Sequence, residues 1–227
     1  MKLFDLSLYL VLDSELCREH SVIDTTRAAV AGGATMVQLR DKTVGTSGLV
    51  EIGKVLMAVL AGTGVPLIVN DDVDAALAIV ADGVHVGQDD LPPSTVRARL
   101  GPEKLLGLSV ETPAAARLID PAVVDYVGLG PVFATPTKPD HKHPIGFDGL
   151  ARLVELSPVP SVAIGGLKAF HVPQVLASGA DGLAVVSAIC GQPAPETAAR
   201  DIYRAIAQGR RELTATAGSS ARPRAKL

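Results

Sequence analysis

The sequence predicts a single-domain (β/α)8 barrel, the TIM-barrel member of the α/β class. The chain has 227 residues, about the length of one such barrel. Short runs rich in Val, Ile and Leu alternate with Ala-rich stretches, at a spacing of roughly 20–35 residues that is typical of a βα unit. The runs number eight, as a barrel requires. The alternative is a Rossmann sheet, but no G-x-G-x-x-G motif opens the first predicted helix.

The predicted strands are apolar along their whole length. Continuous apolar runs are typical of parallel strands that are buried on both faces. The start of the chain, Met1–Asp13, resembles a signal peptide, but it has an acidic residue inside it, no small-residue cleavage site and a β-like pattern, so we interpret it as a strand. The strands are predicted at Leu8–Leu12, Met36–Leu39, Leu67–Val69, Gly83–Val86, Leu105–Leu108, Tyr126–Leu129, Ser161–Ile164 and Leu183–Val186.

The stretches between the strands show the apolar spacing of helices, and several begin beside Thr, Asp or Pro. Helices are predicted at Thr25–Ala31, Leu49–Ala61, Val73–Val80, Pro113–Ile119, Phe147–Leu156 and Ala169–Ala177. A closing helix at Glu196–Leu213 completes a catalytic domain of residues 1–213. Residues 214–227 are polar and lack apolar periodicity, so we predict a disordered tail there.

The composition excludes several classes of protein. Aromatic residues make up only 3% of the chain and Trp is absent, which disfavours a stacking surface for nucleic acid. The net charge of -3 gives no broad polyphosphate-binding surface. No apolar run reaches the ~18 residues of a membrane span. The two cysteines, Cys17 and Cys190, are too few for a disulfide framework, so we expect buried thiols and a cytoplasmic location.

The first group of candidate site residues follows the second strand. Active sites of barrels form at the C-terminal ends of the strands. Alternation places Gln38, Arg40 and Lys42 on one side and turns Leu39 toward the helices. Two cations beside an amide suit an oxyanion-rich ligand such as diphosphate. The alternative is a strand end held by salt bridges.

Acidic residues follow the third and fourth strands. Neighbouring strands lie ~4.8 Å apart, so carboxylates from both ends can converge. Two carboxylates, together with substrate phosphate and water, are a usual way to hold Mg2+. We predict Asp71 and Asp90 as the metal ligands, and Asp72 and Asp89 as caps of the following helices. His85, inside the fourth strand, is predicted to be a hydrogen-bonded core residue.

The next two strands contribute hydroxyl groups and a cation. The fifth strand leads to Ser109, but no G-x-S-x-G motif marks it as a hydrolase nucleophile. The sixth strand runs into a long loop punctuated by Gly and Pro that carries Thr135, Thr137 and Lys138. A loop of this length in a compact barrel is usually a lid or a binding loop.

The last two strands predict a monophosphate site. Gly165 and Gly166 follow the seventh strand, and Val186 and Ser187 end the eighth. In this architecture these loops commonly present backbone N–H groups to a phosphate. Two anion sites at one barrel mouth suggest the condensation of two phosphorylated molecules, without identifying either one.

Taken in order, these motifs resemble those of the thiamine-phosphate synthase family. The resemblance covers about residues 8–190. Each motif is weak alone, but the ordered set at the family's spacings is specific. The matching segments are Gln38–Lys42, Val69–Asp71, Gly83–Pro92, Gly130–Phe133 with Thr135, Thr137 and Lys138, Ala163–Gly166, and Val185–Ile189.

The resemblance implies a Mg2+-dependent transferase that joins hydroxymethylpyrimidine diphosphate to a thiazole phosphate, giving thiamine phosphate and diphosphate. Asp71 and Asp90 would hold Mg2+. The pyrimidine substrate would be bound by Gln38, Arg40, Lys42, Asn70, Ser109 and Lys138, of which Arg40, Lys42, Ser109 and Lys138 would also be catalytic. The thiazole phosphate would be bound by Thr135, Thr137, Gly166, Val186 and Ser187.

Two other functions are weighed against this one. A thiazole tautomerase is a similar barrel, but it would need an acid/base such as a histidine at a strand end and has no use for a diphosphate clamp. A non-catalytic phosphate-ligand sensor would not require the metal pair. We expect small-molecule substrates and no nucleic-acid or membrane partner. The oligomeric state stays open, with a homo-oligomer among the alternatives.

Overall fold

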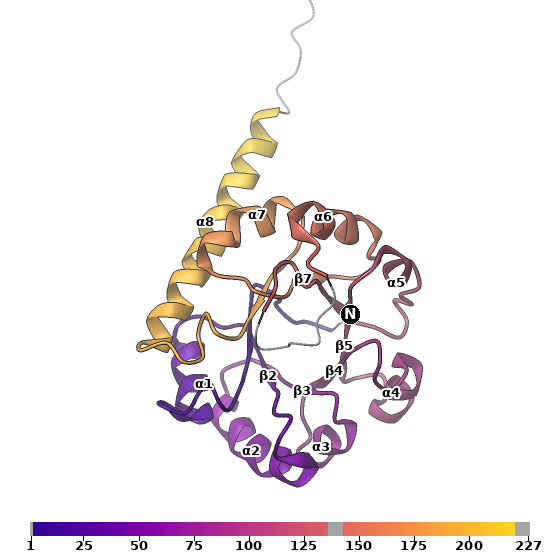
Figure 1. The fold of residues 1–227 in the computed structure, drawn as a ribbon, viewed down its shortest axis with the longest axis vertical. Coiled ribbons are helices and arrows are strands. Elements are labelled where there is room, and N and C mark those ends of the chain that lie inside the picture. The colour runs from indigo at the N-terminus through magenta and orange to yellow at the C-terminus, as the bar shows by residue number, and fades with distance from the viewer. Residues whose placement is uncertain (1, 136–142, 221–227) are drawn as a thin grey trace, which may run out of the picture.

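The chain folds into a closed barrel of parallel strands surrounded by helices (Figure 1). The structure is a computed structural model that describes residues 2–135 and 143–220, with side chains in the last helix described up to residue 215. The strands follow one another around the barrel in chain order, and the eighth pairs with the first. The predicted fold class is therefore confirmed.

The observed strands lie where the sequence predicts them, and differ by at most two residues at an end. Three of them, β2, β4 and β6, begin and end at the predicted residues. The strands are β1 (Leu8–Val11), β2 (Met36–Leu39), β3 (Leu67–Asn70), β4 (Gly83–Val86), β5 (Leu105–Val110), β6 (Tyr126–Leu129), β7 (Ser161–Ala163) and β8 (Gly182–Val185).

The helices form an outer ring around the strands. They are α1 (Ser21–Ala31), α2 (Gly45–Leu60), α3 (Val73–Ala78), α4 (Pro93–Leu100), α5 (Pro113–Arg117), α6 (Gly146–Leu156), the 3-10 helix η1 (Ala169–His171), α7 (Val172–Ala177) and α8 (Pro195–Ser220). The stretch predicted as one helix at Ala169–Ala177 is thus divided between η1 and α7. Within the described chain, no helix is long and apolar enough to cross a membrane.

Helix α4 is absent from the sequence prediction. Only Val96 and Leu100 of its residues are buried, so the segment lacks the apolar periodicity by which a helix is recognised. A proline at the start and Arg97 and Arg99 in the last turn nevertheless favour a helix at this place.

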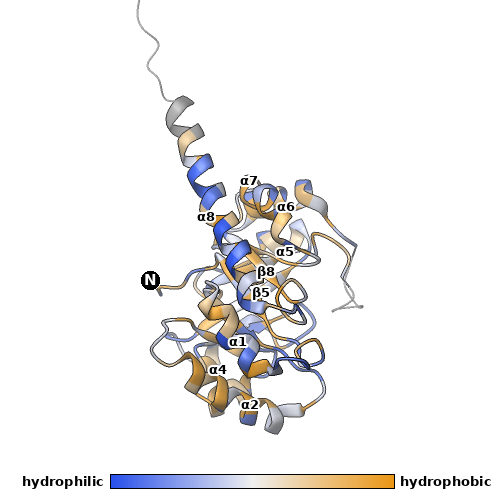
Figure 2. Ribbon diagram, turned by 90° about the vertical axis from the view of Figure 1, so that its left-hand side faces the viewer, coloured by the Kyte–Doolittle hydropathy of each residue, from blue (hydrophilic) through white to orange (hydrophobic). Residues whose placement is uncertain are grey.

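The last helix is longer than predicted. The sequence places its end at Leu213, but α8 continues to Ser220, so the expected disorder of residues 214–220 is wrong. Beyond Leu213, Thr214 Oγ1 donates a hydrogen bond to the Arg210 carbonyl at 2.8 Å within the helix. Figure 2 shows α8 projecting away from the barrel, with hydrophilic residues along the part of the helix below its grey end. Residues 221–227, the remainder of the expected tail, lie outside the described residues.

Two apolar layers hold the barrel together. The larger layer lies between strands and helices and includes Leu39, as the predicted alternation requires. The smaller layer fills the barrel interior with side chains from Leu6, Tyr9, Met36, Ile68, Leu105, Tyr126, Val162 and Ala184. Because the strands are parallel, their carboxyl ends meet at one mouth of the barrel, and the register sets Asn70 beside His85 there.

Candidate active site

A pocket of about 260 Å³ opens at the carboxyl ends of the strands. Among the residues that line it are Gln38, Arg40, Lys42, Asn70, Asp71, Asp90, Ser109, Thr135, Gly166, Val186 and Ser187. These are all the predicted site residues that the structure describes. Thr137 and Lys138 lie outside the described residues.

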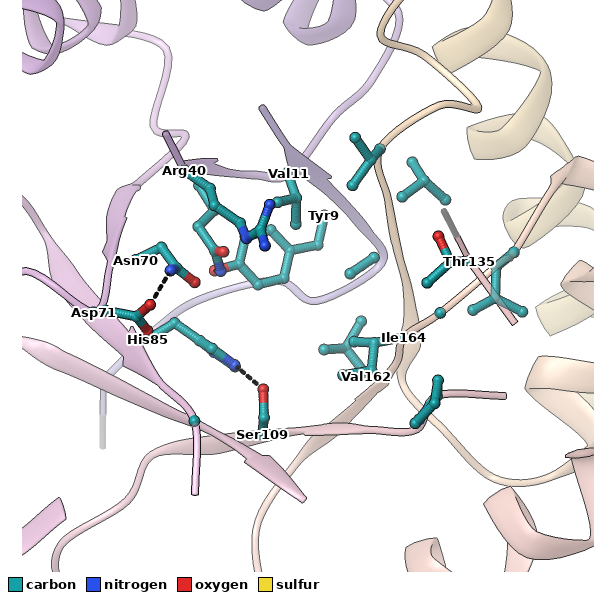
Figure 3. Close-up of a pocket in the computed structure, with 18 of the residues that line it drawn as sticks. Tyr9, Val11, Arg40, Asn70, Asp71, His85, Ser109, Thr135, Val162 and Ile164 are labelled. Carbon is teal, nitrogen blue, oxygen red and sulfur yellow. Dashed lines mark hydrogen bonds between the residues drawn. The ribbon is translucent and has the colours of Figure 1, made fainter. Parts of the chain in front are cut away.

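The two predicted metal ligands face one another at the ends of β3 and β4. Asp71 has a φ of 61°, a left-handed conformation that Asp tolerates better than most residues, and its Oδ2 accepts a hydrogen bond from Asn70 Nδ2 at 2.6 Å (Figure 3). Burial, and then the adjacent Asp90 carboxylate, raise the pKa of Asp71 to about 7, although Arg40 acts in the opposite direction. Asp90 is held by a bond from the Gly87 N–H to its Oδ2 (2.7 Å).

This donor set fits Mg2+ better than a closed structural metal site. Among the described residues, no three His, Cys, Asp or Glu side chains gather as a metal cage. Mg2+ is commonly held by one or two carboxylates and takes its other ligands from phosphate and water. Burial, and then the adjacent Asp90 carboxylate, raise the pKa of Asp71, and a divalent cation would favour the ionised form of both carboxylates.

Asp72 and Asp89, which adjoin the two predicted metal ligands in the sequence, differ in whether they cap a helix. Asp72 caps α3 as predicted, and its carboxylate accepts a hydrogen bond from the Ala75 N–H at 2.8 Å. The prediction that Asp89 caps the next helix is wrong. Helix α4 is preceded by Pro92 and has no side-chain cap, while Asp89 is exposed and lines the pocket. Asp89 lies too far before the first turn to reach its N–H groups.

The wall between β4 and β6 contains buried polar side chains. His85 is only 6% exposed, and its Nε2 lies 2.9 Å from Ser109 Oγ (Figure 3). The prediction of a hydrogen-bonded core histidine is therefore confirmed, and His85 also lines the pocket. Tyr9, which the sequence analysis did not select, lines it as well. Burial raises the pKa of the Tyr9 and Tyr126 phenols, so both keep their hydrogens.

Glycine-rich loops form the opposite side of the pocket. Gly165 and Gly166 have φ angles of 93° and 66°, which favour glycine. A Cβ atom on Gly166 would lie 2.8 Å from the Ala134 carbonyl oxygen, so the loop after β6 can approach only a glycine. In Figure 3, Thr135 faces Asn70 and Asp71 from across the pocket.

Sequence reasoning missed Lys168, which contacts Ser187 on this second side of the pocket. Its Nζ donates a hydrogen bond to Ser187 Oγ at 2.9 Å, and Gln192 Nε2 donates to the Ser187 carbonyl at 2.8 Å. No carboxylate of the described residues forms a salt bridge with Lys168. The available signal was a cation that closely follows Gly165-Gly166 in the sequence.

Comparison with known proteins agrees with this geometry. A family model described as thiamine monophosphate synthase matches residues 8–189. A thiamine-phosphate synthase of Xanthobacter autotrophicus is 50% identical over 209 residues, which cover 92% of this chain and 99% of the relative. One from Solidesulfovibrio magneticus is also 50% identical and covers 91% of this chain and 98% of the relative.

Solved structures agree as well. Thiamine phosphate pyrophosphorylase from Pyrococcus furiosus superimposes with a TM-score of 0.81 at 34% identity, covering 90% of this chain and 96% of that one. A 3-hexulose-6-phosphate synthase, at 22% identity and a TM-score of 0.64, shares the fold. By the family model, the relatives and the fold together, this chain belongs to the thiamine-phosphate synthase family.

Proposed function

We propose that this pocket joins hydroxymethylpyrimidine diphosphate to thiazole phosphate and releases thiamine phosphate and diphosphate. The observation that carries the proposal is the division of one pocket into two anion-binding sides. Arg40, Lys42 and the Asp71–Asp90 pair lie on one side, and Gly166 and Ser187 lie on the other. Such a division suits two phosphorylated substrates that must meet between the two sides.

The charged side would take the diphosphate. Asp71 and Asp90 would hold Mg2+, which supplies positive charge against the leaving diphosphate. Arg40 and Lys42 would stabilise the same charge as the bond to the pyrimidine methylene carbon breaks. Gln38, Asn70 and Ser109 would orient the pyrimidine ring. Lys138 is proposed to close over the diphosphate from the loop after β6.

The glycine side would hold the thiazole phosphate. The phosphate would be bound by Gly166, Val186 and Ser187, and Thr135 and Thr137 would assist. Lys168, whose Nζ donates a hydrogen bond to Ser187, would add a positive charge to this site. The thiazole nitrogen then attacks the electron-poor methylene carbon of the pyrimidine. No protein nucleophile is needed, because positioning and electrostatic stabilisation supply the rate enhancement.

The two alternative functions fit the pocket less well. A thiazole tautomerase could use His85, but both ring nitrogens of His85 are engaged by Tyr126 and Ser109. It would also leave the cations and the carboxylate pair without a role. A phosphate-ligand sensor would bind the thiazole phosphate without turnover. A cytoplasmic location, supported by the presence of only two cysteines in the sequence, is part of the proposal.

One assay tests the function. The purified protein is mixed with both phosphorylated precursors and Mg2+, and thiamine phosphate is sought by mass spectrometry. Product is expected only when both precursors are present. Binding of thiazole phosphate without product would favour the sensor, and movement of a proton from one position of the thiazole to another without coupling would favour the tautomerase.

A further inference from the structure

A chain of hydrogen bonds crosses the barrel interior beneath the pocket and joins two of the residues proposed to contact the pyrimidine. It starts at Gln38 on β2, whose Nε2 donates to Tyr9 Oη at 2.8 Å. Tyr9 Oη lies 2.9 Å from Tyr126 Oη, which lies 3.2 Å from His85 Nδ1. The chain ends with His85 Nε2, 2.9 Å from Ser109 Oγ.

The packing of the barrel interior buries this chain of hydrogen bonds and leaves room for its side chains. Gln38, Tyr9, Tyr126 and His85 are each no more than 6% exposed, so water does not compete for their polar atoms. Tyr126 packs edge-on against Tyr9, with ring centroids 6.0 Å apart, and lies 5.6 Å from the His85 ring. A Cβ atom on Gly107 would lie 2.3 Å from the Tyr126 ring and 2.4 Å from His85 Nδ1, so glycine is required at position 107.

The hydrogens in the chain run in one direction. The Gln38 amide nitrogen can only donate, so Tyr9 accepts from it. Tyr9 then passes its single hydrogen to Tyr126, and Tyr126 passes its own to His85 Nδ1. With the Gln38 amide nitrogen turned toward Tyr9, the reverse arrangement would leave the Tyr9 hydrogen without an acceptor in the buried interior, at a cost of about 1–3 kcal/mol.

The direction determines what the pocket offers to a ligand. Because His85 Nδ1 accepts, the ring proton resides on Nε2 and is donated to Ser109 Oγ. Ser109 Oγ thus uses one of its two lone pairs to accept from His85, and its own hydrogen remains available for donation into the pocket. At the other end, Gln38 keeps its carbonyl oxygen and one amide hydrogen.

We propose that His85 is a positioning residue that acts through Ser109 and that, together with Tyr126 and Tyr9, it sets the hydrogen-bonding pattern read by the pyrimidine ring. Ser109 offers its hydrogen, which suits an acceptor nitrogen of the ring, and Gln38 accepts and donates, which suits an amino group beside a ring nitrogen. The inference rests on the proposed function for the identity of the ring. The direction of the hydrogen bonds depends on the protein alone and not on the identity of the substrate.

The direction can be measured without any substrate. Nitrogen NMR of protein labelled at its five histidines distinguishes the two tautomers, and the His85 signal is assigned as the one lost in His85→Asn. We expect the proton on Nε2 in the wild type and a mixture of tautomers in Tyr126→Phe, which keeps the ring and removes only the hydroxyl. A proton on Nδ1 in the wild type would overturn the proposal, whether or not the protein makes thiamine phosphate.

Kinetics test the consequence for the ligand. Tyr126→Phe should raise KM for the pyrimidine diphosphate about fivefold to tenfold, the loss of about one oriented hydrogen bond, and leave KM for thiazole phosphate unchanged. Tyr203→Phe, on the half-exposed face of α8, is the matched control. In a Ser109→Ala background, Tyr126→Phe should have no further effect, because its influence passes through Ser109.

Additive effects of the two substitutions would refute a role through Ser109. Equal increases in both KM values, or a loss of turnover that accompanies a lower Tm, would assign Tyr126 to the general stability of the barrel. A wild type that fails to couple the two precursors while showing the Nε2 proton would overturn the proposed function and leave the hydrogen-bond chain intact.

Discussion

The two sides of the pocket are built on different principles. On the side of β2–β4, charged groups are proposed to bind the diphosphate, and burial together with the adjacent Asp90 carboxylate raises the pKa of Asp71 to about 7. On the side of β7 and β8, the proposed phosphate site relies on backbone geometry, with Gly165 and Gly166 in left-handed conformations. On the charged side, the ionised form of Asp71 is destabilised in the folded protein, so this side lowers the free energy of unfolding. The glycine side instead loses conformational freedom on folding.

The difference between charged groups and backbone geometry matches the proposed role of each side. The thiazole phosphate keeps its charge throughout the proposed reaction, so a site of hydrogen-bond donors serves it in every state. The diphosphate gains charge as it leaves, so its side needs cations that stabilise the transition state more than the ground state. Substitutions on the charged side should therefore lower turnover, and those on the glycine side should weaken binding.

The largest expected effect is on the charged side. Asp71→Asn or Asp90→Asn should lower turnover well over tenfold, equivalent to more than about 1.4 kcal/mol of barrier, because the metal loses a carboxylate ligand. Turnover is measured at saturating precursors and Mg2+. Asp74→Asn, at an exposed carboxylate on α3, is the matched control and should retain full activity. Undiminished wild-type activity in excess chelator would remove the metal from the mechanism.

A smaller effect is expected on the glycine side. Lys168→Ala should raise KM for thiazole phosphate about tenfold, since one charge-assisted contact beside Ser187 is lost, while turnover at saturation changes little. Lys54→Ala on the exposed face of α2 controls for the loss of a surface lysine. If turnover fell and the KM for thiazole phosphate did not rise, Lys168 would belong with the charged side.

The cost of the carboxylate pair should be visible in stability. An acid whose pKa is raised by folding destabilises the folded state only where it would otherwise be ionised. The penalty is absent below about pH 4, grows as the pH rises to about 7, and is complete above that. Asp71→Asn should therefore raise stability at pH 8, on the order of 1 kcal/mol after allowance for partial exposure.

Thermal unfolding with and without the substitution checks this expectation at two pH values. Asparagine tolerates the left-handed backbone at position 71, so the comparison isolates the charge. A gain of a few degrees in Tm is expected at pH 8, and a smaller one at pH 5. An equal gain at both pH values would attribute the effect to packing.

The smallest effect is expected far from both sides. A chain that ends at Leu213 should keep its activity, and its stability should change by less than about 0.5 kcal/mol. The described side chains of α8 from Arg211 to Ala215 are exposed, so this part of the helix buries little apolar area. Circular dichroism and the coupling assay measure both quantities. A large drop in Tm would show that the end of the chain docks on the barrel.

The sequence predicted the charged side better than the glycine side, for a physical reason. Strand alternation and the shared edge of parallel strands bring Arg40, Lys42, Asp71 and Asp90 to one place. Both rules depend only on where the strands end in the sequence, so this side can be predicted without a structure. No such rule finds Lys168, because its approach to Ser187 depends on the turn through η1. Likewise, nothing in the spacing of Tyr9, His85 and Tyr126 indicates that their polar atoms meet inside the barrel.

The fold shows the same limit. Apolar runs predicted the strands, since burial on both faces leaves a strong signal in composition. Helix α4 was missed because it buries only two residues, and the end of α8 because the sequence after Leu213 shows no apolar periodicity. Asp89 was assigned as a cap from its position beside a helix start, but the prolines at 92 and 93 shift that start beyond its reach.

The pairing of β1 with β8 joins segments that are far apart in the chain. Until β8 docks, the incomplete sheet has two open edges, one on β1 and one on the last strand added. Unpaired parallel edges are templates for another chain, and the β8 of one molecule is complementary to the β1 of the next. A destabilised β1–β8 seam should therefore lead to exchange of β8 between molecules, and the barrel would then assemble as a domain-swapped pair.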